Sequence, residues 1–160
     1  MPNKRESAAG GKLRVTRILM PTDFSAGAEP ALAWAMGLAE VFGAGITVLH
    51  VLDPTLGAMS GLPGDFGAMS AYGEILEIVR REARSEMAKI EKRYPTAETV
   101  IREGSPRAGI LDAAAEIGAN LIVMGTHGRT GFAHVLFGSV AEHVVRHSRI
   151  PVLTVRQQPQ

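Results

Sequence analysis

Short apolar runs alternate with segments of helical periodicity along this chain. The runs are too short for helices and rich in β-branched residues, so each is expected to form a buried strand. They lie at residues 15–20, 46–51, 99–101, 121–124 and 151–155. Between them, apolar residues recur three and four positions apart, which predicts helices at 31–42, 72–94, 106–117 and 139–147. This alternation predicts an α/β fold, a doubly wound parallel sheet of five strands with helices on both faces.

The helix at residues 72–94 is expected to bury one apolar stripe. Its members are Ile75, Val79, Ala83, Met87, Ile90 and Tyr94. Glu77 and Arg81 lie one turn apart on the outer face, where they are expected to form a solvated ion pair. Trp34, in the first helix, is expected to pack against the core rather than to serve as a stacking platform.

Turn-forming and capping residues mark the helix ends. Ser25 is a candidate N-cap for the first helix, and Pro30 is expected in or just before its first turn. Ser105 is the predicted N-cap of the helix that follows the third strand, with Pro106 at its first position and Gly118 closing it. The segment 53–73 is predicted to be a long loop, either a flap near the binding site or an ordinary surface excursion.

The composition excludes several classes of function. With 160 residues, 46% of them hydrophobic, the chain fits one globular domain. A net charge of +1 argues against nucleic-acid binding by charge, and no apolar run reaches the roughly 18 residues that span a bilayer. The absence of cysteine excludes disulfides and thiolate catalysis and fits a cytoplasmic location. Residues 1–13 are polar and basic and are predicted to be a flexible tail before a domain at 14–156; the alternative is that they contact an anionic partner.

Polar or glycine-rich groups follow three of the predicted strands. They are Pro21-Thr22-Asp23, His50-Val51 with Asp53, and Gly125-Thr126-His127-Gly128. In open parallel sheets, ligands bind at the carboxyl ends of strands, near the point where the strand order reverses. We therefore expect these three segments to share one site.

Gly125, Gly128 and Gly138, with Ser139 at a helix start, form a candidate phosphate cradle. Glycine lets backbone N–H groups approach phosphate oxygens, and a helix N-terminus adds unpaired donors. Ser139 would then be an N-cap that also donates to a phosphate; the alternative is that it only caps and that the glycines only form turns. No Gly-x-x-x-x-Gly-Lys segment is present, so the site is not of the Walker type.

The remaining polar candidates have simpler interpretations. Asp23 is expected to cap a turn or to accept a hydrogen bond from a ribose or base, rather than to act in catalysis. His127 is expected to shape its loop near the phosphates. Arg107 and Arg129 are the nearest cations for a phosphate, although Arg129 could equally be a solvated side chain. His143 and His147 have the spacing of a zinc pair but are read as a surface pair, and His50 as a hydrogen-bonded, partly buried histidine.

Three segments carry a resemblance to a known family: residues 17–25, residues 48–51, and residues 121–155. The last contains Gly125-x-x-Gly128, nine residues, and then Gly138-Ser139-Val140. Over roughly residues 14–156 the chain resembles the universal stress protein family, in the subgroup that keeps the complete glycine pattern and binds ATP. The resemblance implies strand order 3-2-1-4-5 and a homodimer that pairs its last strands, between Pro151 and Val155.

The resemblance also implies which residues hold the nucleotide. Pro21, Thr22 and Asp23 would meet the base and ribose, and Val51 would lie against the adenine. The other candidate positions are Met124, Gly125, His127, Gly128, Arg129, Gly138, Ser139 and Val140. A Mg²⁺ ion would be carried by the phosphates, with no metal ligands from the protein. The chain departs from the family pattern at Asn120 and His134, outside the glycine framework.

These observations favour a regulatory protein that binds ATP and responds to it as a homodimer. The alternative is an enzyme of related fold, a slow ATPase or an adenylating transferase. A third possibility is an interaction module that binds no nucleotide.

Overall fold

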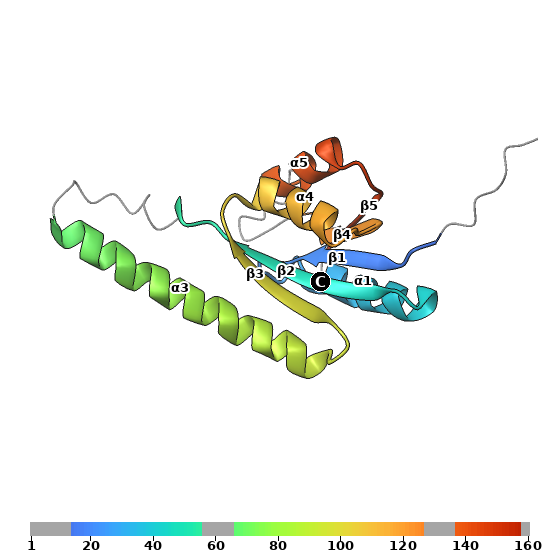
Figure 1. Cartoon of the computed structure of the whole chain (residues 1–160), viewed down its shortest axis with the longest axis horizontal. Helices are drawn as coiled ribbons and strands as arrows, with labels where there is room; N and C mark the ends of the chain where they lie inside the picture. The colour runs from blue at the N-terminus through green and yellow to red at the C-terminus, as the bar shows by residue number, and fades with distance from the viewer. Residues whose placement is uncertain (1–13, 56–65, 127–136, 158–160) are drawn as a thin grey trace, which may run out of the picture.

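The computed structural model describes residues 14–55, 66–126 and 137–157, without the side chains of residues 66–71. The strands are β1 (Arg17–Pro21), β2 (Gly45–Leu52), β3 (Glu98–Glu103), β4 (Leu121–Gly125) and β5 (Val152–Val155). The helices are α1 (Glu29–Phe42), α3 (Phe66–Arg93), α4 (Pro106–Glu116) and α5 (Ser139–His147) (Figure 1). The strands form one parallel sheet of order β3-β2-β1-β4-β5, which confirms the predicted α/β fold.

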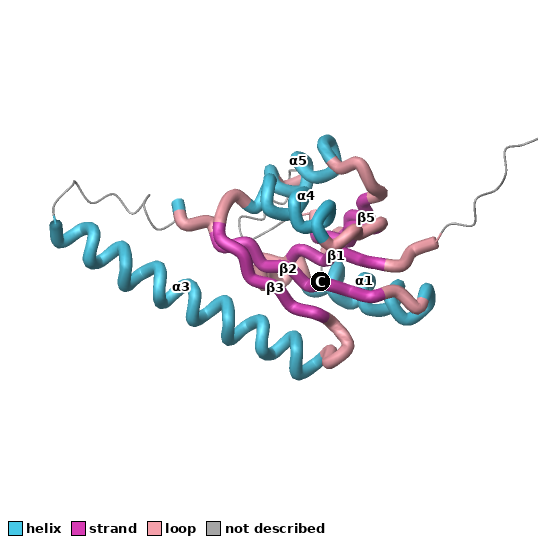
Figure 2. Tube along the Cα trace, viewed as in Figure 1, coloured by secondary structure: helices cyan, strands magenta, loops and turns pink. Residues whose placement is uncertain are grey.

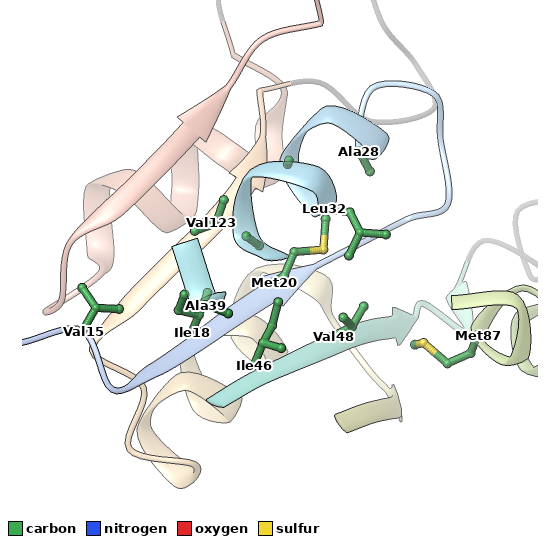
Figure 3. Close-up of a cluster of buried hydrophobic side chains, with 12 residues drawn as sticks. Val15, Ile18, Met20, Ala28, Leu32, Ala39, Ile46, Val48, Met87 and Val123 are labelled. Atoms are coloured by element: carbon green, nitrogen blue, oxygen red, sulfur yellow. The ribbon is translucent and has the colours of Figure 1, made fainter. Parts of the chain in front are cut away.

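The helices cover the two faces of the sheet in pairs. Helices α1 and α3 lie on one face and α4 and α5 on the other, as the trace shows (Figure 2). Under α1, side chains of β1, β2 and β4 pack with Leu32, Ala39 and, from α3, Met87 (Figure 3). A second cluster beneath α4 and α5 includes Leu19, Ile110 and Val144. Burying both faces explains why the central strands are apolar at nearly every position.

The first helix begins earlier than predicted and has a different cap. Helix α1 starts at Glu29, its N-cap is Ala28, and Pro30 lies in its first turn as expected. Ser25 is not the N-cap, because its hydroxyl donates to the Asp23 carboxylate instead, at 2.6 Å. The packing role predicted for Trp34 is also wrong, since this side chain is 58% exposed on α1.

Helix α3 is longer than predicted and buries only part of the predicted stripe. It begins at Phe66, so residues 66–73 of the predicted loop are helical, while residues 56–65 lie outside the described chain. Ala83 and Met87 are buried, but Ile75 and Val79 are 37% and 38% exposed. The predicted partner of Glu77 is also wrong, because Glu77 pairs with Arg80 rather than with Arg81.

Asn120 joins the beginnings of β1 and β4. Its Oδ1 accepts hydrogen bonds from the N–H groups of Thr16 and Arg17, at 3.0 and 3.1 Å, and its Nδ2 donates to the Arg14 carbonyl at 2.7 Å. An aspartate could accept the first two bonds but could not donate the third. The family resemblance implies an aspartate at position 120, and Asn120 therefore makes a hydrogen bond that an aspartate could not make.

The later helices agree closely with the sequence. Helix α4 follows Ser105 as N-cap with Pro106 at its start, and Gly118, just beyond it, has a φ of +61°. Helix α5 spans the predicted residues, but its N-cap is Gly138, so Ser139 is the first helical residue rather than the cap.

Candidate functional site

A cavity of about 170 Å³ lies at the carboxyl ends of the central strands. It is closed on one side by the beginnings of α4 and α5. Its lining includes the described positions that the family resemblance assigned to the nucleotide: Pro21, Thr22, Asp23, Val51, Met124, Gly125, Gly138, Ser139 and Val140. His50, Asp53 and Arg107, which the sequence also placed at or near the site, do not line it. His127, Gly128 and Arg129, like His134, lie outside the described residues. The structure thus brings together side chains from segments that are far apart in the sequence.

Several lining residues were missed from the sequence. They are Ala28, Leu49, Pro106, Ile110 and Ala141, whereas Thr126, also in the lining, belongs to a segment predicted at the site. Pro106 and Ile110 belong to the first half of α4, which follows the carboxyl end of β3. Since helix starts and strand ends meet at one edge of a parallel sheet, the Ser105-Pro106 start signal could have placed α4 at the site.

The turn after β1 forms one wall of the cavity. The N–H of Thr22 donates to the Leu49 carbonyl at 2.8 Å, which holds the turn to β2. The Asp23 carboxylate accepts a hydrogen bond from the N–H of Ser25 at 3.1 Å, as well as the one from its hydroxyl. Asp23 therefore stabilises its own turn, as predicted, and also belongs to the cavity lining.

His50 lies behind this turn and is almost completely buried. Its side chain is 6% exposed, and its Nδ1 lies 2.7 Å from the carbonyl oxygen of Thr22. A carbonyl oxygen only accepts, so Nδ1 carries the proton in this contact. The imidazole also packs against the ring of Phe24, with centroids 4.3 Å apart. The prediction of a hydrogen-bonded, partly buried histidine is confirmed.

The start of α5 forms the opposite wall. The N–H of Gly138 donates to the Thr126 carbonyl at 2.7 Å, and the N–H of Thr126 donates to Val155 at 3.1 Å. Thr126, only 3% exposed, therefore fixes the start of α5 to the ends of β4 and β5. The N–H groups of a first helical turn have no partners within the helix, and together with the helix dipole they favour an anion.

The other histidines form a surface pair on α5. The rings of His143 and His147 stack with centroids 4.1 Å apart, and Nδ1 of His147 lies 2.8 Å from the His143 carbonyl. The pKa of His143 is lowered mainly by desolvation of its ring, and further by electrostatic repulsion from His147 and Arg107. Among the described residues, no three His, Asp or Glu side chains gather as a metal site. Arg107 itself is exposed near the start of α4.

Among the described segments, no helix combines the length and the apolar character that crossing a membrane demands.

Known proteins of one family are similar to this chain over most of its length. A model of the universal stress protein family matches residues 14–156. The universal stress protein MJ0531 of Methanocaldococcus jannaschii is 34% identical over 88% of this chain and 82% of its own length. MJ0577 of the same organism is 30% identical over 89% of this chain and 95% of its own.

Solved structures share the fold. The structure of MJ0577 superposes with a TM-score of 0.81 at 29% identity, covering 92% of this chain and all of that one. The universal stress protein UspA from Lactobacillus plantarum gives 0.77 at 27% identity, covering 90% of this chain and 99% of its own. More distant structures, one in complex with cAMP and one from Archaeoglobus fulgidus in complex with dAMP, have the same fold. This chain belongs to the universal stress protein family.

Proposed function

We propose that this protein binds ATP, with Mg²⁺ carried by the phosphates, and acts as a homodimeric regulator that responds to the nucleotide under stress. The observation that carries the proposal is the shared cavity. Three strand ends and two helix starts converge there, and the described residues that the family resemblance assigned to the nucleotide line it. The mononucleotide complexes belong to more distant proteins, and here they only suggest ligands to test.

The cavity suits a base and a ribose at its inner end. Leu49, Val51, Ile110 and Met124 provide apolar walls from the sheet and from α4. Ligand sites commonly combine such walls with a few polar groups that fix orientation. Asp23 is one of these groups, because its carboxylate belongs to the lining and can accept a hydrogen bond from a ribose hydroxyl.

The phosphates would lie at the start of α5. Gly138, Ser139 and Val140 line the cavity. The backbone N–H groups of Ser139 and Val140 belong to the first turn of the helix, which has no partners for them within the helix, whereas the N–H of Gly138 is bonded to the Thr126 carbonyl. Magnesium usually keeps several waters and binds through substrate phosphates. Since no cluster of three acidic or histidine ligands occurs in the described part of the chain, a metal held by phosphate oxygens and water fits these residues.

Regulation fits the chain better than catalysis. A P-loop lysine is missing from the sequence, so the usual machinery of rapid phosphoryl transfer is absent. Strand β5 lies at an edge of the sheet, where unpaired backbone groups can join a second copy. A nucleotide that binds one arrangement of this dimer more tightly would shift the population toward it by that difference in affinity.

A ligand series tests the proposal. The protein is purified without added nucleotide, and any extracted nucleotide is identified by mass. Calorimetry then compares MgATP with MgGTP, adenosine, tripolyphosphate, cAMP and dAMP. MgATP should bind more tightly than adenosine or tripolyphosphate, because only ATP occupies both ends of the site.

The same preparation separates a regulator from an enzyme. A regulator binds MgATP with turnover close to background. An enzyme releases ADP, or pyrophosphate and AMP, at a rate that is lost in Asp23→Ala. If no nucleotide is extracted and none of the series binds at millimolar concentration, the proposal is wrong.

A further inference from the structure

The turn formed by residues 22–25 separates two cavities. Asp23 lines the candidate nucleotide cavity, whereas Phe24 and Ser25 line a second cavity of about 210 Å³ between α1 and α3. Thr22 lines both. Neither Phe24 nor His50 is part of the nucleotide-cavity lining. The turn is therefore a thin wall, and its conformation determines where Thr22 and Asp23 face the ligand.

The backbone of this wall is held in an unfavourable conformation. Phe24 has a φ of +61°, the left-handed region that bulky residues rarely adopt. The N–H of Phe24 donates to Oγ1 of Thr22 at 3.0 Å, and the Asp23 carboxylate bonds to Ser25 on the other side. A strained residue persists only where its surroundings hold it, and such residues concentrate at functional sites.

His50 supplies that support from near the carboxyl end of β2. Its Nδ1–H donates to the Thr22 carbonyl at 2.7 Å, which holds the beginning of the turn. Its ring packs on the Phe24 ring at 4.3 Å with 34° between the planes, which holds the strained residue itself. One buried side chain on β2 thus contacts both residues that flank Asp23.

We propose that His50 and Phe24 are positioning residues that clamp the 22–25 turn, so that Thr22 and Asp23 are set for the nucleotide before it arrives. This inference rests on the proposed nucleotide site. A wall that is already ordered spares the ligand the cost of ordering it, so the clamp raises affinity without touching the ligand. Loosening the clamp should weaken binding more than it weakens the fold.

Paired substitutions separate positioning from packing. His50→Asn keeps an N–H donor at the δ position, whereas His50→Gln moves it to the ε position. Phe24→Tyr keeps the ring, and Phe24→Ala removes it. Met87→Ala is the matched control, because Met87 lies on the buried side of α3 and does not line the candidate nucleotide cavity.

Two measurements on the full chain decide the outcome. Loss of one such hydrogen bond should weaken MgATP binding by up to about tenfold in His50→Gln, with partial recovery in His50→Asn. Phe24→Ala should weaken binding and Phe24→Tyr should not. In the absence of ligand, the amides of Phe24 and Ser25 should exchange with solvent faster in His50→Gln and Phe24→Ala than in Met87→Ala.

Met87→Ala shows how much MgATP affinity changes through lost stability alone. If the His50 and Phe24 variants lose no more affinity than Met87→Ala does, the proposed clamp is wrong. Unchanged exchange at the Phe24 and Ser25 amides would overturn it as well. If the unmodified protein binds no nucleotide, the proposed function fails, but the exchange measurement still decides whether His50 and Phe24 hold the turn.

Discussion

Gly109 on α4 approaches Val51 on β2 so closely, beside the candidate nucleotide cavity, that a side chain at position 109 would be crowded. A Cβ atom on Gly109 would lie 3.3 Å from both γ-carbons of Val51. Val51 lines the cavity, whereas Gly109 is not part of the lining. The missing side chain at Gly109 therefore lets α4 approach the sheet closely enough to hold Val51 against the candidate adenine position.

Gly109→Ala should lower nucleotide affinity with little change in stability. Alanine gains up to about 1 kcal/mol of helix propensity, which offsets the crowding against Val51. The crowded Val51 must give way by a few tenths of an ångström, and because Val51 lines the cavity we expect it to shift into that space. Thermal melts and MgATP titrations measure the two effects. Tight binding by a destabilised variant would contradict this account. In a Val51→Ala background, the same Gly109 change should lose most of its effect.

Ser139→Ala should separate ligand binding from helix capping. Because Gly138 is the N-cap of α5, loss of the Ser139 hydroxyl should change the free energy of unfolding by no more than about 0.5 kcal/mol. MgATP should bind roughly tenfold more weakly, since a hydrogen bond to a charged phosphate is lost. Adenosine affinity should stay unchanged, and Ser139→Thr should retain MgATP binding. Calorimetry with both ligands checks the prediction, and equal MgATP affinity would reject the phosphate role.

Thr154→Pro should abolish the proposed dimer while leaving the sheet intact. The carbonyls of Pro151 and Val155 accept hydrogen bonds from β4, so alternate residues of β5, Val152 and Thr154, direct their backbone groups to the free edge. Proline at Thr154 removes an outward N–H, which edge strands tolerate. Sedimentation velocity should show a monomer with a melting temperature close to that of the unmodified chain.

Leu153→Pro is the matched control, because the N–H of Leu153 faces β4 and its loss should destabilise the fold itself. A dimer that survives Thr154→Pro would show that the subunits meet elsewhere.

Glu103 should make the fold sensitive to acid. Arg80 contacts its carboxylate with two parallel hydrogen bonds, Nε to Oε1 at 2.7 Å and Nη2 to Oε2 at 3.0 Å, and joins α3 to the end of β3. These hydrogen bonds lower the pKa of Glu103 from its usual 4.5. The stabilisation that this ion pair gives the fold is therefore complete above the pKa of Glu103 in the unfolded chain. It is lost as the pH falls through the lower pKa that Glu103 has in the folded protein.

Urea unfolding measured at several pH values, from about 7 down to about 3, checks this expectation. The stability of Glu103→Gln should fall less steeply below the ordinary glutamate pKa than that of the unmodified protein. Parallel curves for the two proteins would show that the ion pair contributes nothing. Other carboxylates titrate in the same range, so the comparison between the two proteins carries the result.

The alternation of apolar runs and helical periodicity was sufficient to predict the fold and the edge of the sheet that carries the site. It could not predict which side chain wins a local competition. Serine is a common N-cap residue, yet the Ser25 hydroxyl donates to the Asp23 carboxylate, and the N-cap of α1 is Ala28 instead. Periodicity likewise assigned Ile75 to the core, because a pattern of apolar positions contains no information on where the sheet beneath a helix ends.

The site shows the same division. Strand ends such as Pro21 and Gly125 were predicted because topology places them together, and the structure brings them to one cavity. The contribution of Ile110 was missed, since it depends on how closely α4 approaches the sheet, and that distance is set by the absence of a side chain at Gly109. The nucleotide roles of all these residues stay predictions until a ligand is measured.

Helix α3 extends well past the strands that support it. Its 28 residues make a rod of about 42 Å at 1.5 Å per residue, whereas β3, with six residues, is only about 20 Å long. The side chains of Ile75 and Ile78 are exposed, and fully buried contacts with the core begin at Ala83. The first turns can therefore fray without opening the core, so their amides should exchange by local opening. We therefore expect the sheet and its cavity to keep their shape while the beginning of α3 opens and closes.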